Sequence, residues 1–342
     1  MAPAAQLIGS SSAFLDAVEA ASAAARLSRP VLVIGERGTG KELIAERLHR
    51  LSPRWGGPLV SLNCAALPEN LVDAELFGHE AGAFTGASRA RAGRFEDADG
   101  GTLFLDEIAT LSAAAQERLL RVVEYGELTR LGSNKPVQVD VRLVGATNED
   151  LPGLVARGRF RADLLDRLSF EVITLPPLRE RAEDIGVLAL HFGRRMASEL
   201  GWPRFVGFTP QALALLEAHP WPGNIRELKN VVERAVYRWG DEATPVGRII
   251  IDPFESPWRP GGAPAPVASL PAKIDPAGDV AAPARPASVA DLRAAVHAYE
   301  KDLLLAALER CRHNQRKTAA ALALTYDQLR HALKRHDLLE KE

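Results

Sequence analysis

The sequence predicts an α/β protein with a parallel sheet and a helical subdomain, followed by a linker and a small all-α module. Five short apolar runs alternate with helix-sized stretches, a pattern typical of a parallel sheet covered on both faces. These runs are residues 31–34, 59–62, 102–105, 141–146 and 171–175. Beyond residue 185 the apolar period becomes helical, over residues 185–199, 209–219 and 224–239.

Composition restricts the class of protein. A chain of 342 residues with 46% hydrophobic residues can form two domains, or one domain and a module. The formal charge of -2 argues against a uniformly basic nucleic-acid-coating protein, so any contact with DNA requires a local patch. Two distant cysteines, Cys64 and Cys311, favour a reduced compartment. No apolar run has membrane-spanning length and no signal peptide is visible, so we expect a cytoplasmic protein without direct membrane insertion.

The first apolar run leads into a glycine-rich loop and then a predicted helix, the context of a phosphate-binding loop. Its residues are Gly35, Glu36, Arg37, Gly38, Thr39, Gly40 and Lys41. The glycines allow backbone N–H groups to converge on a polyphosphate, and Lys41 reaches the β and γ phosphates. Glu42 stands where Ser or Thr usually holds Mg²⁺. It can serve the metal through water, or it is simply an acid in the first turn of a helix.

Polar residues follow the later strands, where open α/β sheets bind their ligands. Asp106 and Glu107 directly follow the third run. They suit Mg²⁺ binding by Asp106 and orientation of a water by Glu107. An acid at this place can also be a helix cap, but the preceding phosphate loop favours a Walker B element. Asn63 and the pair Thr147 and Asn148 follow two other strands, and alone they would be ordinary turn residues.

Residues 35–41, 106–107, 146–148 and above all 78–87 resemble the AAA+ P-loop ATPase domain of bacterial sigma-54-dependent transcription activators, the enhancer-binding proteins. The resemblance covers residues 9–254 and the C-terminus. It implies a hexameric ring of this chain that hydrolyses ATP with Mg²⁺ and remodels the closed complex of sigma-54 RNA polymerase holoenzyme to an open complex. It also places Asn63 and Glu107 beside the γ phosphate, so we expect Asn63 to hold Glu107 away from water until the ring engages its target.

A glycine-flanked hexapeptide carries most of this resemblance. Its residues are Gly82, Ala83, Phe84, Thr85, Gly86 and Ala87. The resemblance implies that Phe84 and Thr85 contact sigma-54, whereas a flexible hairpin with a partly buried Phe is the structural alternative. Residues 130–136 form a second candidate loop with the turn chemistry to move beside it.

Three arginines receive roles through the same resemblance. Arg161 and Arg167 would be the fingers that reach the γ phosphate of a neighbouring subunit, and Arg226 would be the sensor II arginine on the subunit's own nucleotide. Arginine suits phosphoryl charge because its fork is planar and permanently charged. Arg161 and Arg167 could equally pair with Asp163 or Asp166, and Arg226 could be one more helix-surface arginine.

Four segments follow from these patterns. Residues 1–176 are the nucleotide-binding subdomain, 177–256 the helical lid, 257–288 a Pro/Ala-rich linker, and 289–342 a DNA-binding domain. The linker holds almost no large apolar side chain and its prolines keep it extended.

The C-terminal segment reads as a helix-turn-helix formed by residues 314–323 and 326–334. Residues 310–336 carry seven Lys or Arg against one acid, which favours DNA over a merely solvated face. The segment resembles the Fis-type module of the same activators, and implies enhancer DNA as a ligand. The candidate contacts are Arg316, Lys317, Thr325, Tyr326, Gln328, Arg330 and Lys334.

Control is expected to come from outside the chain, because little sequence precedes residue 31 to form a sensory domain. We expect a separate negative regulator, and Trp55, in the loop 52–58, is its candidate contact. A Trp folded over a core edge is the alternative.

Two other functions are compatible with parts of this sequence. An AAA+ unfoldase or chelatase subunit would need neither the 82–87 loop nor a DNA module. A DNA-binding regulator that uses nucleotide only as a switch would not need Asp106, Glu107 and two candidate trans arginines.

Overall fold

The computed structural model describes residues 7–84, 87–254, 292–311, 315–322, 324, 326–336 and 338. The chain divides into two units, Met1–Gly262 and Ala263–Glu342. The predicted linker, residues 257–288, and the hexapeptide residues Thr85 and Gly86 lie outside the described residues.

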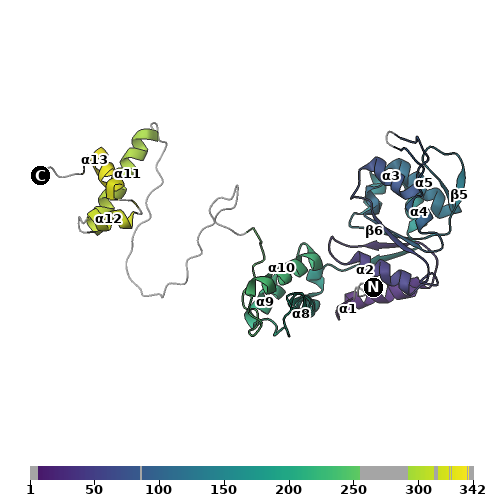
Figure 1. Ribbon diagram of the computed structural model, residues 1–342, viewed down its shortest axis with the longest axis horizontal. Helices are drawn as coiled ribbons and strands as arrows, with labels where there is room; N and C mark the ends of the chain where they lie inside the picture. The colour runs from purple at the N-terminus through teal and green to yellow at the C-terminus, as the bar shows by residue number, and fades with distance from the viewer. Residues whose placement is uncertain are drawn as a thin grey trace. The chain divides into compact units, whose positions relative to one another are not determined.

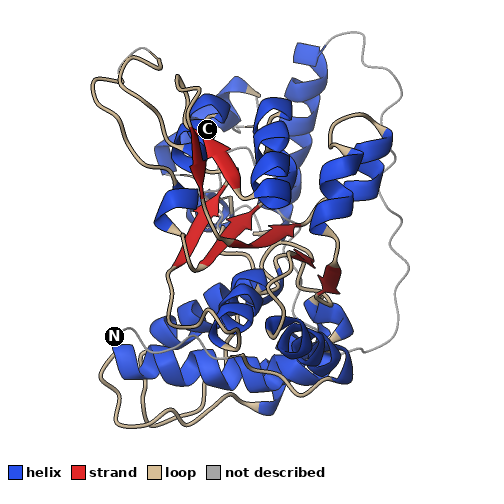
Figure 2. Cartoon of the chain, turned by 90° about the vertical axis from the view of Figure 1, so that its right-hand side faces the viewer, coloured by secondary structure: helices blue, strands red, loops and turns tan. Residues whose placement is uncertain are grey.

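A five-stranded parallel sheet forms the centre of the first unit (Figure 2). Its strands are β1 (Val31–Ile34), β2 (Leu59–Asn63), β3 (Thr102–Asp106), β6 (Arg142–Thr147) and β7 (Glu171–Thr174), in the order β2-β3-β6-β1-β7. Every neighbouring pair is parallel. The predicted fold class is therefore confirmed, and each predicted run corresponds to one strand.

Helices cover both faces of this sheet. They are α1 (Ser12–Ala25), α2 (Lys41–Arg50), α3 (Glu69–Phe77), α4 (Arg94–Asp97), the 3₁₀ turn η1 (Ile108–Thr110), α5 (Ala113–Tyr125), α6 (Leu151–Ala156) and α7 (Ala162–Leu168). Side chains alternate along each strand, so Val31 and Val33 join the core under α1 and α2. Leu32 and Leu103 point the other way, into the core under α3 to α7.

Strand register brings the polar strand ends together. Asn63 on β2 lies opposite Asp106 on β3, and Ile34 on β1 lies opposite Thr147 on β6. The phosphate loop follows Ile34 directly. The parallel strands therefore deliver the loop, the acids and the amides to one edge of the sheet.

A short antiparallel hairpin lies outside the main sheet and was not predicted. It pairs β4 (Glu127–Thr129) with β5 (Pro136–Gln138), and the candidate second loop is its turn. Leu131 donates its N–H to the carbonyl of Gly78 at 2.9 Å, and Glu80 donates its N–H to the carbonyl of Leu131 at 2.9 Å. The two candidate loops are thus joined through their backbones.

The lid consists of the 3₁₀ turn η2 (Leu178–Glu180) and of α8 (Ala182–Glu199), α9 (Pro210–Ala218) and α10 (Asn224–Trp239), which gather into one bundle (Figure 1). Thr209 caps α9 by accepting the N–H of Ala212 at 3.2 Å, with proline in the first turn. Trp221 is fully buried and donates its indole N–H to the carbonyl of Leu216 at 2.8 Å. A separate apolar core therefore supports the lid.

The second unit contains α11 (Leu292–Arg310), α12 (Gln315–Ala321) and α13 (Tyr326–Arg335). Leu304 and Leu308 of α11 pack with Ala319 of α12 and with Leu329 and Leu333 of α13. Within the described parts of the chain, no helix is long and apolar enough to span a membrane.

Candidate nucleotide site

The phosphate loop has the backbone that its glycines predict. Gly38 and Gly40 have φ values of 80° and 96°, a region that glycine occupies without strain. Lys41 is only 7% exposed, and its Nζ donates to the carbonyl of Gly35 at 2.9 Å and to that of Glu36 at 3.4 Å. Burial lowers the pKa of Lys41, while the charges of Glu107 and Asp106 oppose this shift. Two backbone carbonyls of the loop therefore hold the ammonium group of Lys41 in place.

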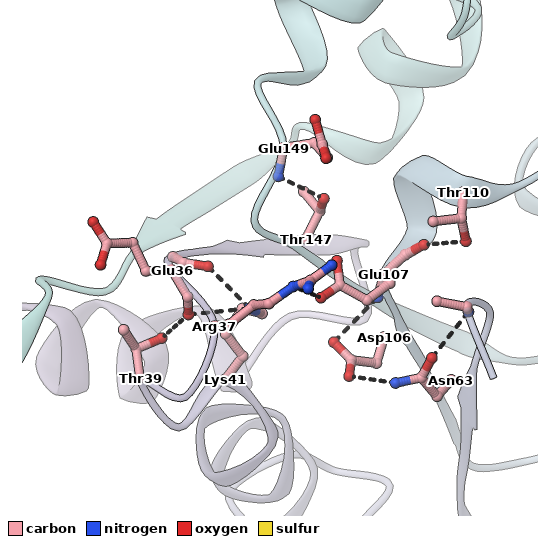
Figure 3. A network of polar contacts seen from close by, with 12 residues as sticks. Glu36, Arg37, Thr39, Lys41, Asn63, Asp106, Glu107, Thr110, Thr147 and Glu149 are labelled. Carbon is pink, nitrogen blue, oxygen red and sulfur yellow. Dashed lines mark hydrogen bonds and ion pairs between the residues drawn. The ribbon is translucent and has the colours of Figure 1, made fainter. Parts of the chain in front are cut away.

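Asp106 ends β3 and is held from two sides. Asn63 donates its side-chain amide to Oδ2 of Asp106 at 3.0 Å, and the N–H of Glu107 donates to Oδ1 at 3.1 Å (Figure 3). Glu107 has a φ of 54°, a left-handed conformation that is uncommon outside glycine. This turn directs the two neighbouring acids to different partners.

Glu107 contacts Asn148 and Arg37. With its amide turned for donation, Asn148 reaches both carboxylate oxygens of Glu107, at 3.0 and 2.7 Å. Nε of Arg37 lies 4.0 Å from Oε1 of Glu107. Strand register places the amide of Asn63 on Asp106, and it is Asn148 that contacts Glu107 here. That Asn63 restrains Glu107 until the ring engages its target stays a prediction.

A cavity of about 590 Å³ joins these groups to the lid. It is lined by Arg37, Gly38, Gly40, Lys41, Glu42, Leu43, Asn63, Ala65, Ala66, Asp106, Glu107, Ile225, Arg226 and Lys229. The combination of a buried lysine, glycine backbone and carboxylates fits a nucleoside polyphosphate with Mg²⁺. Thr147 is buried beneath the site, where its hydroxyl accepts the N–H of Glu149 at 3.0 Å.

Three residues at this site were not predicted from the sequence. Lys229 lies one helical turn after Arg226 on α10, and that spacing is the signal that could have indicated it. Arg179 and Asn224 contact Glu36, whose carboxylate is turned away from Lys41 and Asp106 (Figure 3). The side chain of Glu36 therefore faces the lid and does not line the cavity.

The two candidate fingers lie apart from their own cavity. Arg161 precedes α7 and forms a two-pronged ion pair with Asp163, at 3.0 and 2.7 Å. Arg167, within α7, donates to Glu124 at 2.7 Å, so it does not use Asp166. Both guanidinium groups are substantially exposed, and neither lines the cavity.

A backbone hydrogen bond joins the two ends of the hexapeptide. The N–H of Gly82, at φ 81°, donates to the carbonyl of Ala87 at 2.8 Å. Phe84 is 39% exposed and lies edge-on to His79 with ring centroids 5.0 Å apart. Arg130 of the second loop ion-pairs with Glu80 at 3.2 Å and with Glu96 of α4 at 2.7 Å. The loop is thus anchored at its base and presents an aromatic ring at its surface.

Candidate DNA contacts lie on α12 and α13. Lys317, Tyr326, Gln328, Arg330 and Lys334 are exposed. The hydroxyl of Tyr326 donates to Gln315 at 3.2 Å. Thr325 and the side chain of Arg316 fall outside what the structure describes.

A P-loop ATPase domain with a helical lid, fused to a helix-turn-helix, defines an ATP-dependent regulator of transcription. Comparison with known families makes the assignment specific. The pattern of the Sigma-54 interaction domain matches residues 7–174, that of the AAA+ ATPase lid domain matches 179–244, and that of the Bacterial regulatory protein, Fis family, matches 296–336. The chain belongs to the sigma-54-dependent transcriptional activators, and its first unit is an AAA+ ATPase.

Individual relatives agree with this assignment. The chain is 54% identical to the Psp operon transcriptional activator of Escherichia coli (strain K12), over 97% of this chain and 98% of that protein. It is 45% identical to the transcriptional regulatory protein ZraR of Salmonella typhimurium, over 93% of this chain and 66% of that protein. A crystal structure of NtrX from Brucella abortus in complex with ATP is similar with a TM-score of 0.68 and 32% identity, covering 97% of this chain and 70% of that one.

Proposed function

We propose that this chain activates a phage-shock-type operon by coupling ATP hydrolysis to the conversion of the sigma-54 RNA polymerase closed complex to an open complex. The near full-length match with the Psp operon transcriptional activator carries the proposal of this operon class. The Fis-family match of residues 296–336 favours this function over an unfoldase or a chelatase, because neither of those needs a Fis-type module.

The site geometry supports a division of catalytic roles. Lys41 is placed to neutralise phosphate charge, and Asp106 is placed to hold Mg²⁺, with Glu42 assisting through water. When bound, Mg²⁺ would neutralise charge on the transferred phosphoryl group. Glu107 orients the attacking water, and Asn148 fixes the carboxylate that does so. Asn63 holds the carboxylate of Asp106, and the hydroxyl of Thr147 accepts the backbone N–H of Glu149.

The arginines support a ring of identical subunits, which we propose to be a hexamer. Arg161 and Arg167 are exposed and lie outside their own cavity, so they are available to the nucleotide of a neighbouring copy. Their present ion pairs are solvent-exposed and cost little to break. Arg226 lines its own cavity and would contact the nucleotide of its own subunit.

The partner contacts follow the surfaces described above. Residues 82–87 would engage sigma-54 with the exposed ring of Phe84 at the tip, and α13 would bind enhancer DNA in the cytoplasm. Trp55 is 72% exposed, which disfavours the alternative of a Trp folded over a neighbouring core edge. An exposed Trp suits an interface anchor, so we propose it as a contact for a negative regulator of the phage-shock type.

An in vitro open-complex assay tests the function. Purified protein, sigma-54 holoenzyme and ATP are incubated on a supercoiled phage-shock promoter with its upstream enhancer, and single-stranded DNA near the start site is measured. We expect melting with the wild-type protein and none with Lys41→Ala. Thr85→Ala should retain ATPase activity and lose melting, since the loop contacts the polymerase. Failure of the wild-type protein to melt this promoter, while it melts another sigma-54 promoter, would contradict the proposed operon.

A further inference from the structure

Glu36 lies in the phosphate loop, yet its side chain is bound entirely by the lid. Nη1 and Nη2 of Arg179 donate to its two carboxylate oxygens at 3.0 and 2.7 Å. The side-chain amide of Asn224 donates to Oε2 of Glu36 at 3.0 Å. The hydrogen bond from Arg179 lowers the pKa of Glu36, and that from Asn224 lowers it further, so the carboxylate is ionised throughout the neutral range.

Asn224 connects this contact to the backbone on both sides. Its amide nitrogen also donates to the carbonyl of Arg37 at 3.0 Å, and its amide oxygen accepts the N–H of Leu178 at 2.7 Å. The side chain is fully buried, and the residue has a φ of 53°. All of these bonds depend on this one orientation of the amide, so Asn224 joins the phosphate loop to η2 and to the start of α10.

The same helix start carries the nucleotide-facing residues of the lid. Arg226 and Lys229 line the cavity from α10, two and five positions after Asn224. The loop and the lid also meet without any intervening side chain: a Cβ on Gly38 would lie 2.3 Å from the carbonyl oxygen of Gly223. The backbone of the loop therefore packs directly against the backbone that precedes α10.

We propose that Glu36, Arg179 and Asn224 form a latch that positions Arg226 and Lys229 over the phosphates by fixing the lid to the phosphate loop. The three are positioning residues, because the described contacts place none of their side chains in the cavity. Releasing the latch lets the start of α10 move away, so the cavity loses the cations of the lid while Asp106, Glu107 and Asn148 keep their places on the sheet. The consequence is weaker binding of ATP with little change in the hydrolytic step.

A double-mutant cycle on the full-length chain tests the latch. Arg179→Ala, Glu36→Gln and the double variant are compared for equilibrium binding of a fluorescent ATP analogue and for KM and kcat of ATP hydrolysis. Each single variant should raise KM and Kd about threefold to fivefold, the range for loss of a partly exposed, well-aligned ion pair. The double variant should be no weaker than the worse single, because each change removes the same interaction. kcat should remain that of the wild type.

Matched variants distinguish loss of the latch from a general effect of removing a positive charge or of lowering stability. Arg194→Ala removes an exposed arginine from α8 without touching Glu36, and should bind ATP normally. Arg179→Lys retains one charged donor and should recover part of the affinity. Equal ATP binding by Arg179→Ala and Arg194→Ala, or additive losses in the double variant, would overturn the latch. Neither readout requires sigma-54 or a particular promoter, so the result stands apart from the proposed operon.

Discussion

Asn148 and Glu107 come from neighbouring strand ends, and the amide of Asn148 reaches both carboxylate oxygens of Glu107. The contact restricts rotation of the Glu107 carboxylate, which lines the cavity. Asn63 performs the corresponding task for Asp106. Each acid is therefore held by its own amide, and mutation of Asn63 or Asn148 can test the two contacts separately.

Replacing Asn148 tests this separation. Asn148→Ala should lower kcat of basal ATP hydrolysis about tenfold to a hundredfold, because a misplaced catalytic group carries a cost of this order. The Kd of ATP should change little, since the lysine and the loop remain. Steady-state kinetics and nucleotide binding measure the two effects. An unchanged kcat would show that the contact with Asn148 does not prepare Glu107 for catalysis.

Lys41 and Glu107 should fail in different ways. Lys41→Ala removes the cation facing the phosphates and should abolish ATP binding, whereas Glu107→Gln should retain ATP and stop its hydrolysis. Equilibrium binding of a fluorescent ATP analogue, together with a single-turnover assay, distinguishes the two defects. Comparable loss of binding in both variants would argue against the assigned roles.

Arg167 gives a test of action between subunits. Arg167→Ala should be inactive alone, and so should Lys41→Ala, but a mixture should regain some ATPase activity. If Arg167 acts in trans, the intact phosphate loop of one subunit would face the intact arginine of the other at a mixed border. ATPase activity is titrated against the mixing ratio at constant total protein. A strictly inactive mixture at every ratio would place Arg167 outside the neighbouring site.

Arg142 gives a test of stability away from the nucleotide. Its guanidinium is 1% exposed and donates to the carbonyls of Ala24 and Ala25 at 2.8 and 3.0 Å, near the end of α1. Burial lowers the pKa of Arg142. Arg142→Ala leaves these buried carbonyls without hydrogen-bond donors. It should therefore lower the free energy of unfolding by on the order of 3 kcal/mol.

Denaturant unfolding with a matched surface variant checks this value. Exposed Arg157→Ala should change the free energy of unfolding by less than about 0.5 kcal/mol. A similar small change for Arg142→Ala would mean that water replaces the lost donors.

The strands and lid helices could be predicted because apolar period and helix caps are local signals. The β4–β5 hairpin could not, since its strands have three residues each and one begins with proline. The nearness of Asn63 to the acids was predictable from parallel strands, but its choice of Asp106 depends on register. The contact of Glu36 with Asn224 spans 188 positions, and nothing local in the sequence indicates it.

Arg130 holds Glu80 on one side and Glu96 on the other, while Leu131 exchanges backbone hydrogen bonds with Gly78 and Glu80. The two loops are consequently joined, so a change in the position of one should change the position of the other. A substitution that tilts the first loop can be offset by a change in the second, so suppressor screens should recover compensating pairs across residues 78–91 and 130–136. Inherited variation in the two stretches should accordingly be correlated, with each loop tolerated only beside a compatible partner.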